Sequence, residues 1–161
     1  MEQQQVLIKI VLDNWYGTVA RTNKLLGELT DAEIEGEVSA DRNSGKYLLG
    51  HLAAVHDRMM PLLGFGEQAY AHYNDVFLTS PDRSGKEMPS VAELRASWND
   101  ANAKLDAHFK TLSAADWFQR HTSVSEEDFA KEPHRNKLGV VVSRTNHLAG
   151  HLGQMVFLKK K

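Results

Sequence analysis

The stretch Asn146–Met155, with the sequence NHLAGHLGQM, contains two histidines four residues apart, His147 and His151. Leu148, Leu152 and Met155 recur at spacings of three and four, which predicts an α-helix. With 3.6 residues per turn, side chains four residues apart differ by about 40° and share one helix face. The two imidazoles are therefore placed to hold one metal ion.

A third histidine, His51, lies in another apolar segment, Tyr47–Leu52, whose spacing also predicts a helix. Leucines at positions 48, 49 and 52 surround it, so we expect its side chain near the core. Three neutral imidazoles from two helices would make an open metal site, with coordination positions left for water or substrate. His51, His147 and His151 are therefore the candidate ligands.

Four segments carry the apolar spacing of amphipathic helices. They cover roughly residues 5–26, 44–63, 91–112 and 138–158, and Gly27 and Pro61 are candidate stops. Asn43 or Ser44 suits the N-cap of the second segment, and Ser90 with Glu93 makes a capping-box pattern for the third. No segment alternates convincingly with period two. We therefore expect an all-α protein, a single four-helix-bundle domain spanning residues 1–161.

Two long connections, residues 64–90 and 113–137, interrupt the predicted bundle. The first is long enough to cross the length of the bundle, so that the second and third helices would run parallel. The second contains two short helical patterns, at residues 114–120 and 126–131. Connections of this length in a compact domain usually carry function or local structure. Either connection is placed to roof a site at one end of the bundle.

Composition excludes several classes of function. Lys+Arg 19 against Asp+Glu 21 gives a net charge of −2, which argues against a nucleic-acid-binding surface. No apolar run approaches the roughly 18 residues of a membrane span. The polar N-terminus does not resemble a secretion signal, so cytoplasmic residence is expected. The chain has no cysteine, so its metal ligands must be His, Asp or Glu, and any thiol must come from outside.

The remaining histidines and the residues beside the pair have plainer interpretations. His56 lies about 140° around the helix from His51, which favours a partner or surface role. Gly150 and Gly153 lower helix propensity and indicate close approach of a ligand, backbone or partner subunit. Gln154 is placed to orient a ligand or water. The other histidines are expected to be solvated: His72, His108, His121 and His134.

Gly50-His51-Leu52 and the H-x-x-x-H-x-G-Q pattern that starts at His147 resemble the DinB/YfiT-like superfamily of metal-dependent enzymes. The resemblance covers nearly the whole chain. It implies a four-helix bundle of up-down-down-up topology with a long crossover between helices 2 and 3. It also implies one divalent ion, commonly zinc or nickel, on His51, His147 and His151, and frequent homodimers. Characterised relatives use mycothiol or bacillithiol as nucleophile.

Three functions remain open at this point. The first is a thiol S-transferase that conjugates an external low-molecular-weight thiol to a small-molecule substrate, with Tyr47, Asn146 and Gln154 as pocket candidates and no assigned catalytic residue. The second is a metal-dependent hydrolase of small esters or lactones; a peptidase is disfavoured because no H-E-x-x-H motif occurs. The third is a non-catalytic, metal-binding stress-response dimer, for which Ile8 and Tyr16 offer a candidate partner surface.

Overall fold

The computed structural model describes residues 2–160, and this part of the chain is all-helical, without a β-strand. Two isolated β-bridges, Glu37 with Ser44 and Arg120 with Asn136, fasten loops. The helices are α1 Gln3–Glu28, α2 Asp31–Glu35, α3 Gly45–Asp57, α4 Met59–Leu62, α5 Tyr73–Phe77, α6 Val91–Phe109, α7 Ala114–Trp117, α8 Glu126–Lys131, α9 Lys137–Met155 and the 3₁₀ turn η1 Val156–Leu158.

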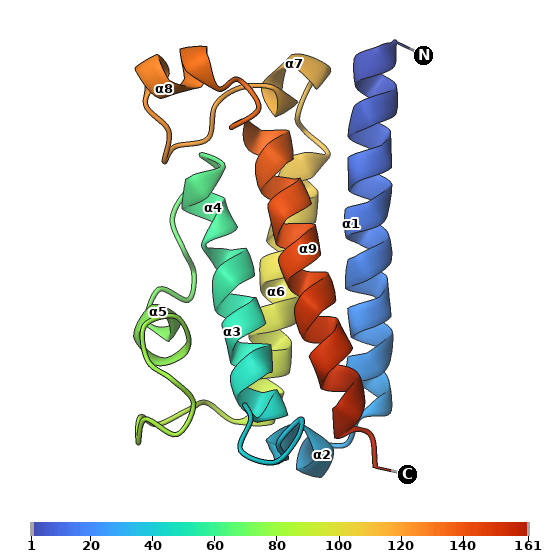
Figure 1. The fold of residues 1–161 in the computed structure, drawn as a ribbon, viewed down its shortest axis with the longest axis vertical. Helices are drawn as coiled ribbons and strands as arrows, with labels where there is room; N and C mark the ends of the chain where they lie inside the picture. The colour runs from blue at the N-terminus through green and yellow to red at the C-terminus, as the bar shows by residue number, and fades with distance from the viewer. Residues whose placement is uncertain (1, 161) are drawn as a thin grey trace.

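The four longest helices, α1, α3, α6 and α9, lie side by side (Figure 1). Closest packing joins α3 to α6 and α1 to α9. The short helix α2 lies at one end of the molecule, α7 and α8 lie at the other, and α5 flanks α3 (Figure 1). The predicted all-α class is therefore confirmed, although the connections contain more helices than the sequence indicated. No helix among residues 2–160 has the length and apolar character to cross a membrane.

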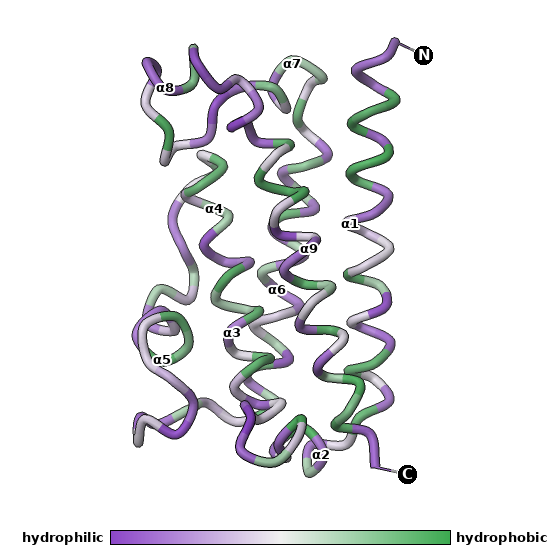
Figure 2. The backbone as a smooth tube through the Cα atoms, in the orientation of Figure 1, coloured by the Kyte–Doolittle hydropathy of each residue, from purple (hydrophilic) through white to green (hydrophobic). Residues whose placement is uncertain are grey.

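The core consists of two apolar clusters stacked along the long helices. Figure 2 shows apolar residues recurring along each of these helices, which is the amphipathic pattern that the sequence predicts. The cluster nearer α2 and α5 contains Leu48, Leu52, Phe77, Leu94, Trp98 and Leu148. The cluster nearer α7 contains Trp15, Leu105, Phe109, Trp117, Leu138 and Val141.

Side-chain caps set the starts of the helices as the sequence predicts. Ser44 accepts a hydrogen bond from the backbone of Tyr47, and Ser90 forms a capping box with Glu93. The second predicted helix breaks at Arg58, and a separate turn, α4, contains Pro61. Proline has no N–H to donate and clashes with the carbonyl four residues earlier, so a break just ahead of it is expected. Gly27 does not stop α1, which continues to Glu28.

The buried face of α1 differs from the predicted one at its N-terminal end. Val6 and Ile10 are 41% and 61% exposed, whereas Ile8 is buried. Tyr16 is half-buried and donates a hydrogen bond to Asp106 at 3.0 Å, so Ile8 and Tyr16 are less exposed than a partner surface on them would require. Spacings of three and four fit two adjacent stripes on a helix, and contacts with neighbouring helices decide between them.

A buried carboxylate that periodicity did not reveal fastens the first long connection. Asp57, the last residue of α3, is fully buried. It accepts hydrogen bonds from the backbone N–H groups of Ala69 and Tyr70, at 3.0 and 2.9 Å, and from the Gln68 amide at 3.3 Å. Since the segment it holds leads into α5, Asp57 helps to fix α5 against α3.

Replacing Asp57 by alanine is therefore expected to lower the free energy of unfolding by about 2–4 kcal/mol, because the backbone N–H groups of Ala69 and Tyr70 lose their buried carboxylate acceptor. Asp75→Ala on α5, which removes a carboxylate that is 70% exposed, is the matched control and should change stability by less than about 1 kcal/mol. Urea denaturation of both variants measures the difference. Equal stabilities would show that Asp57 does not hold the connection.

Candidate metal centre

Three imidazoles converge between α3 and α9. His51 Nε2 lies 3.0 Å from His147 Nε2, and His151 Nε2 lies 3.1 Å from the same atom. One ring nitrogen of each histidine falls within 4.8 Å of the others. The geometry follows from the fold: His147 and His151 are one turn apart on α9, and α3 packs against α9 at the level of His51. The structure thus brings together the three histidines singled out from the sequence.

The outer nitrogens of two rings are held by oxygen atoms. His51 Nδ1 lies 2.8 Å from the backbone oxygen of Phe77, and His151 Nδ1 lies 2.8 Å from Gln154 Oε1. An oxygen of this kind can only accept, so each Nδ1 carries the proton and each Nε2 presents a lone pair to the centre. This is how oxygen acceptors beyond the ligands orient histidines in metal sites.

The three central nitrogens fit a divalent cation better than they fit one another. Neutral His147 can supply at most one proton at Nε2, whereas two lone pairs, from His51 and His151, face that atom. At least one lone pair therefore lacks a donor, and a cation would satisfy all three. Imidazole nitrogen is a favoured ligand of zinc and nickel.

Burial favours the neutral form of His51 and His147, which is the form of imidazole that binds metal. Desolvation lowers the pKa of His51, and the Phe77 carbonyl partly opposes that shift. Desolvation, followed by the neighbouring His151 and His51, lowers the pKa of His147 to about 4. Neutral imidazoles at physiological pH offer their lone pairs without first losing a proton.

Gly50 allows Phe77, whose carbonyl orients the His51 ring, to pack closely against α3. Gly50 is buried in α3, and a Cβ built on it would lie 2.3 Å from Phe77 Cε1 and Cζ. The absence of a side chain therefore lets α5 approach α3 closely enough for the Phe77 carbonyl to reach His51 Nδ1. Tyr47 supports the same segment: its hydroxyl donates to the backbone oxygen of Ser80 at 2.7 Å.

Gly50→Ala is expected to destabilise the protein by about 1–3 kcal/mol through overpacking against Phe77, and to weaken metal binding by displacing the carbonyl acceptor of His51. Gly150→Ala, in α9, is the matched control, because a Cβ there meets no atom within 4 Å. Thermal unfolding and metal titration of both variants test this. If Gly50→Ala is as stable as Gly150→Ala, the close contact with Phe77 does not constrain the fold.

The three pocket candidates from the sequence occupy different environments. Gln154 contacts the centre through His151, as described above. Tyr47 lies beside His51, with ring centroids 6.4 Å apart, and burial followed by the Asp82 carboxylate raises the pKa of its hydroxyl. Asn146 is exposed on α9, and its side chain makes no hydrogen bond with any other residue in the described range.

His56 is neither exposed nor a ligand of the cluster. It is fully buried, its ring lies 4.8 Å from Trp15 and 4.7 Å from Trp98 between centroids, and its Nδ1 donates to Asn102 Oδ1 at 2.9 Å. Its helical angle does separate it from His51, but α1 and α6 cover that side of α3 too, so the expected surface role is wrong. Of the other histidines, His72 and His134 are exposed as predicted, whereas His108 and His121 are half-buried.

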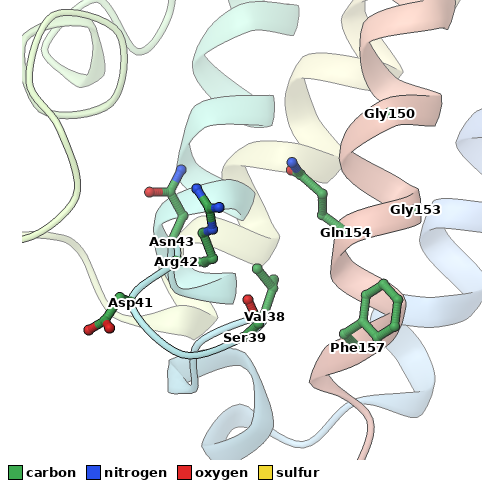
Figure 3. Close-up of a pocket in the computed structure, with 9 residues that line it drawn as sticks. All are labelled: Val38, Ser39, Asp41, Arg42, Asn43, Gly150, Gly153, Gln154 and Phe157. Atoms are coloured by element: carbon green, nitrogen blue, oxygen red, sulfur yellow. The ribbon is translucent and has the colours of Figure 1, made fainter.

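A pocket of about 610 Å³ lies between α9 and the loop that joins α2 to α3, and Gln154 is the residue that links it to the centre (Figure 3). Gln154, which holds His151, lies on its α9 side together with Gly150, Gly153 and Phe157. The loop contributes Val38, Ser39, Asp41, Arg42 and Asn43. This volume is in the usual range for small-molecule sites. No periodic pattern in the sequence marks the loop residues, which is why they were not predicted.

Comparison with known proteins gives a family match and a solved structure of similar fold. The family model of the DinB superfamily matches residues 14–155. The crystal structure of a conserved protein from Enterococcus faecalis is similar over 98% of this chain and 95% of its own, with a TM-score of 0.65 and 16% sequence identity, which shows a shared fold. No curated protein is similar enough in sequence to match.

Proposed function

Because the chain belongs to the DinB superfamily, we propose that it is a divalent-metal-dependent enzyme in which His51, His147 and His151 hold one zinc or nickel ion. The convergence of three Nε2 atoms on one point is the observation that carries this proposal. Within residues 2–160 the cluster has three members, whereas a structural zinc site is normally closed by four protein ligands. An open centre beside a pocket favours catalysis.

The proposed reaction is S-transfer from an external low-molecular-weight thiol, since the chain has no thiol of its own. A divalent cation held there would lower the pKa of a coordinated thiol, so that the thiol would ionise near neutral pH. The sulfur donates an electron pair to an electrophilic carbon and a C–S bond forms. The leaving group departs with the electrons of the broken bond, and the thiol proton passes to solvent.

This chain's own residues would orient the centre and admit the reactants. The Phe77 carbonyl and the Gln154 amide oxygen keep the Nδ1 protons of His51 and His151 directed away from the centre. We propose that reactants approach the centre from the pocket that Gln154 lines. We propose that α1, α3, α6 and α9 form a bundle of up-down-down-up topology, in which residues 64–90 are the crossover.

A paired screen tests the reaction class. Zinc- and nickel-loaded protein is incubated with a panel of thiols and electrophiles, and separately with small esters and lactones, with the His51→Ala/His147→Ala/His151→Ala variant as control. Mass spectrometry should detect metal-dependent thioether products in the parent alone. Hydrolysis without conjugation would replace S-transfer by the hydrolase alternative. Neither reaction in either metal form would contradict the proposed enzyme and favour a non-catalytic metal protein.

Cytoplasmic residence and a homodimer complete the proposal. The exposed apolar residues Val6, Leu7 and Ile10 near the start of α1 are the surface that we assign to the dimer contact. Light scattering of the parent beside a Leu7→Glu/Ile10→Glu variant should give a dimer and a monomer, respectively. A monomeric parent would contradict this part of the proposal.

A further inference from the structure

The pocket beside the three histidines contains a positive charge that no other described residue neutralises. Arg42 lines the pocket, is exposed, and forms no side-chain ion pair or hydrogen bond within residues 2–160. The nearby Glu37 carboxylate is paired with Arg83 instead. Figure 3 shows the Arg42 and Asn43 side chains extending from the loop on the side that faces Gln154, while the Asp41 carboxylate points away from it. The pocket therefore presents a guanidinium and two amide groups.

The backbone that carries Arg42 is held on both sides. Arg42 N–H donates to the Ser39 oxygen at 3.1 Å, and Val38 N–H donates to the Asn43 oxygen at 3.1 Å. Arg83 donates to the Arg42 backbone oxygen at 3.0 Å. Because these hydrogen bonds fix the loop backbone, less backbone entropy is lost when a ligand binds to Arg42.

The opposite wall of the pocket lacks side chains at two positions. Gly150 and Gly153 lie in α9, and a Cβ built on either meets no atom within 4 Å. Packing within the described chain therefore does not require glycine there, although each lowers helix stability by about 1 kcal/mol relative to alanine. The bare helix surface leaves room for a chain of ligand atoms next to His151.

We infer that this pocket binds a carboxylate-bearing small molecule, with the carboxylate at Arg42 and Asn43 and the reacting end at the three histidines. A guanidinium matches a carboxylate with two parallel N–H···O bonds, and the Asn43 amide can donate a third. Val38 and Phe157 supply apolar contact for the carbons between the two ends. In taking the reacting end to be a thiol, the inference rests on the proposed function; the carboxylate site does not depend on it.

Three probes test carboxylate binding at Arg42 and thiol binding at the three histidines separately. 6-Mercaptohexanoate and 6-mercaptohexanol share a thiol but differ in charge, and their binding to nickel-loaded protein is followed by the sulfur-to-nickel charge-transfer absorption. Hexanoate has the charge without the thiol, and its binding to zinc-loaded protein is followed by NMR. The variants are Arg42→Gln and, as a charge-matched control, Lys131→Gln on α8 at the other end of the molecule (Figure 1).

The parent and Lys131→Gln should bind the mercapto acid on the order of 10-fold more tightly than the mercapto alcohol, as expected for a charge-assisted hydrogen bond. Arg42→Gln should lose that preference and its affinity for hexanoate while binding the alcohol unchanged. If both thiols bind equally in the parent, or if Arg42→Gln keeps the preference, the inference is overturned and thiol binding stands. If neither thiol binds but hexanoate binds through Arg42, the carboxylate site stands and the thiol reaction fails. No binding of any probe overturns both.

Discussion

Replacing His147 or His151 by alanine is expected to abolish tight binding of zinc or nickel and to leave a folded, helical protein. Each substitution removes one of the three candidate ligands found among residues 2–160. The loss of affinity should therefore exceed the roughly 10- to 100-fold that follows removal of a partner beyond the ligands. The fold should persist because the clusters around Trp98 and Trp15 do not include these histidines.

Two further variants make this expectation quantitative. Gln154→Ala removes only the acceptor of His151 Nδ1, so its metal affinity should fall by about 10- to 100-fold, between the parent and the histidine variants. His134→Ala removes an exposed histidine outside the cluster and should bind like the parent. Isothermal titration with zinc and nickel measures the metal affinity of each variant, and circular dichroism measures its helical content. Retention of metal by both His147→Ala and His151→Ala would refute the ligand assignment.

The second large effect is acid destabilisation through His56. Burial lowers the pKa of this ring to about 3, and the hydrogen bond to Asn102 offsets the shift only in part. The unfolded chain holds His56 at a pKa near 6.5, so between these values the unfolded state binds the extra proton. The contribution of His56 to stability is therefore complete above about pH 6.5. It is lost as the pH falls toward 3, by at most about 1.4 kcal/mol per pH unit.

Denaturant unfolding of the metal-free protein between pH 7 and pH 4 measures this slope. His51 and His147 also have lowered pKa values and add to it, so the comparison is with His56→Leu under the same conditions. The variant loses the contact with Asn102 and is expected to be less stable at pH 7, but its stability should fall less steeply with acid. Identical slopes would show that His56 is not held neutral in the folded state.

Local signals in the sequence were enough to predict the helical class and several helix starts. Ser44 and Ser90 cap α3 and α6 because their hydroxyls lie within reach of the third backbone N–H, an interaction that needs no distant partner. The buried face of α1 could not be chosen in this way. Whether Ile8 or Ile10 is covered depends on which helices pack beside it, and that information is not local.

In the candidate site, too, the features that are local in sequence were predictable and those that depend on distant segments were not. His147 and His151 share a helix face whatever surrounds them. The resemblance to the DinB superfamily is confirmed by the family match. The Phe77 carbonyl and Arg42 were not predictable, because one is a backbone oxygen from a long connection and the other lies in a loop without periodicity. The environment of His56 was predicted wrongly because the angle around a helix gives the direction of a side chain but does not tell whether a neighbouring helix covers it.

Anomalous X-ray scattering from crystals of zinc-loaded protein, recorded on both sides of the zinc absorption edge, tests the central claim most directly. One peak is expected about 2.0–2.1 Å from Nε2 of His51, His147 and His151, with no fourth protein ligand. The His147→Ala crystal, treated identically, should lack the peak. A peak elsewhere, a fourth side chain closing the site, or no peak at the three histidines in the parent would contradict an open three-histidine metal centre.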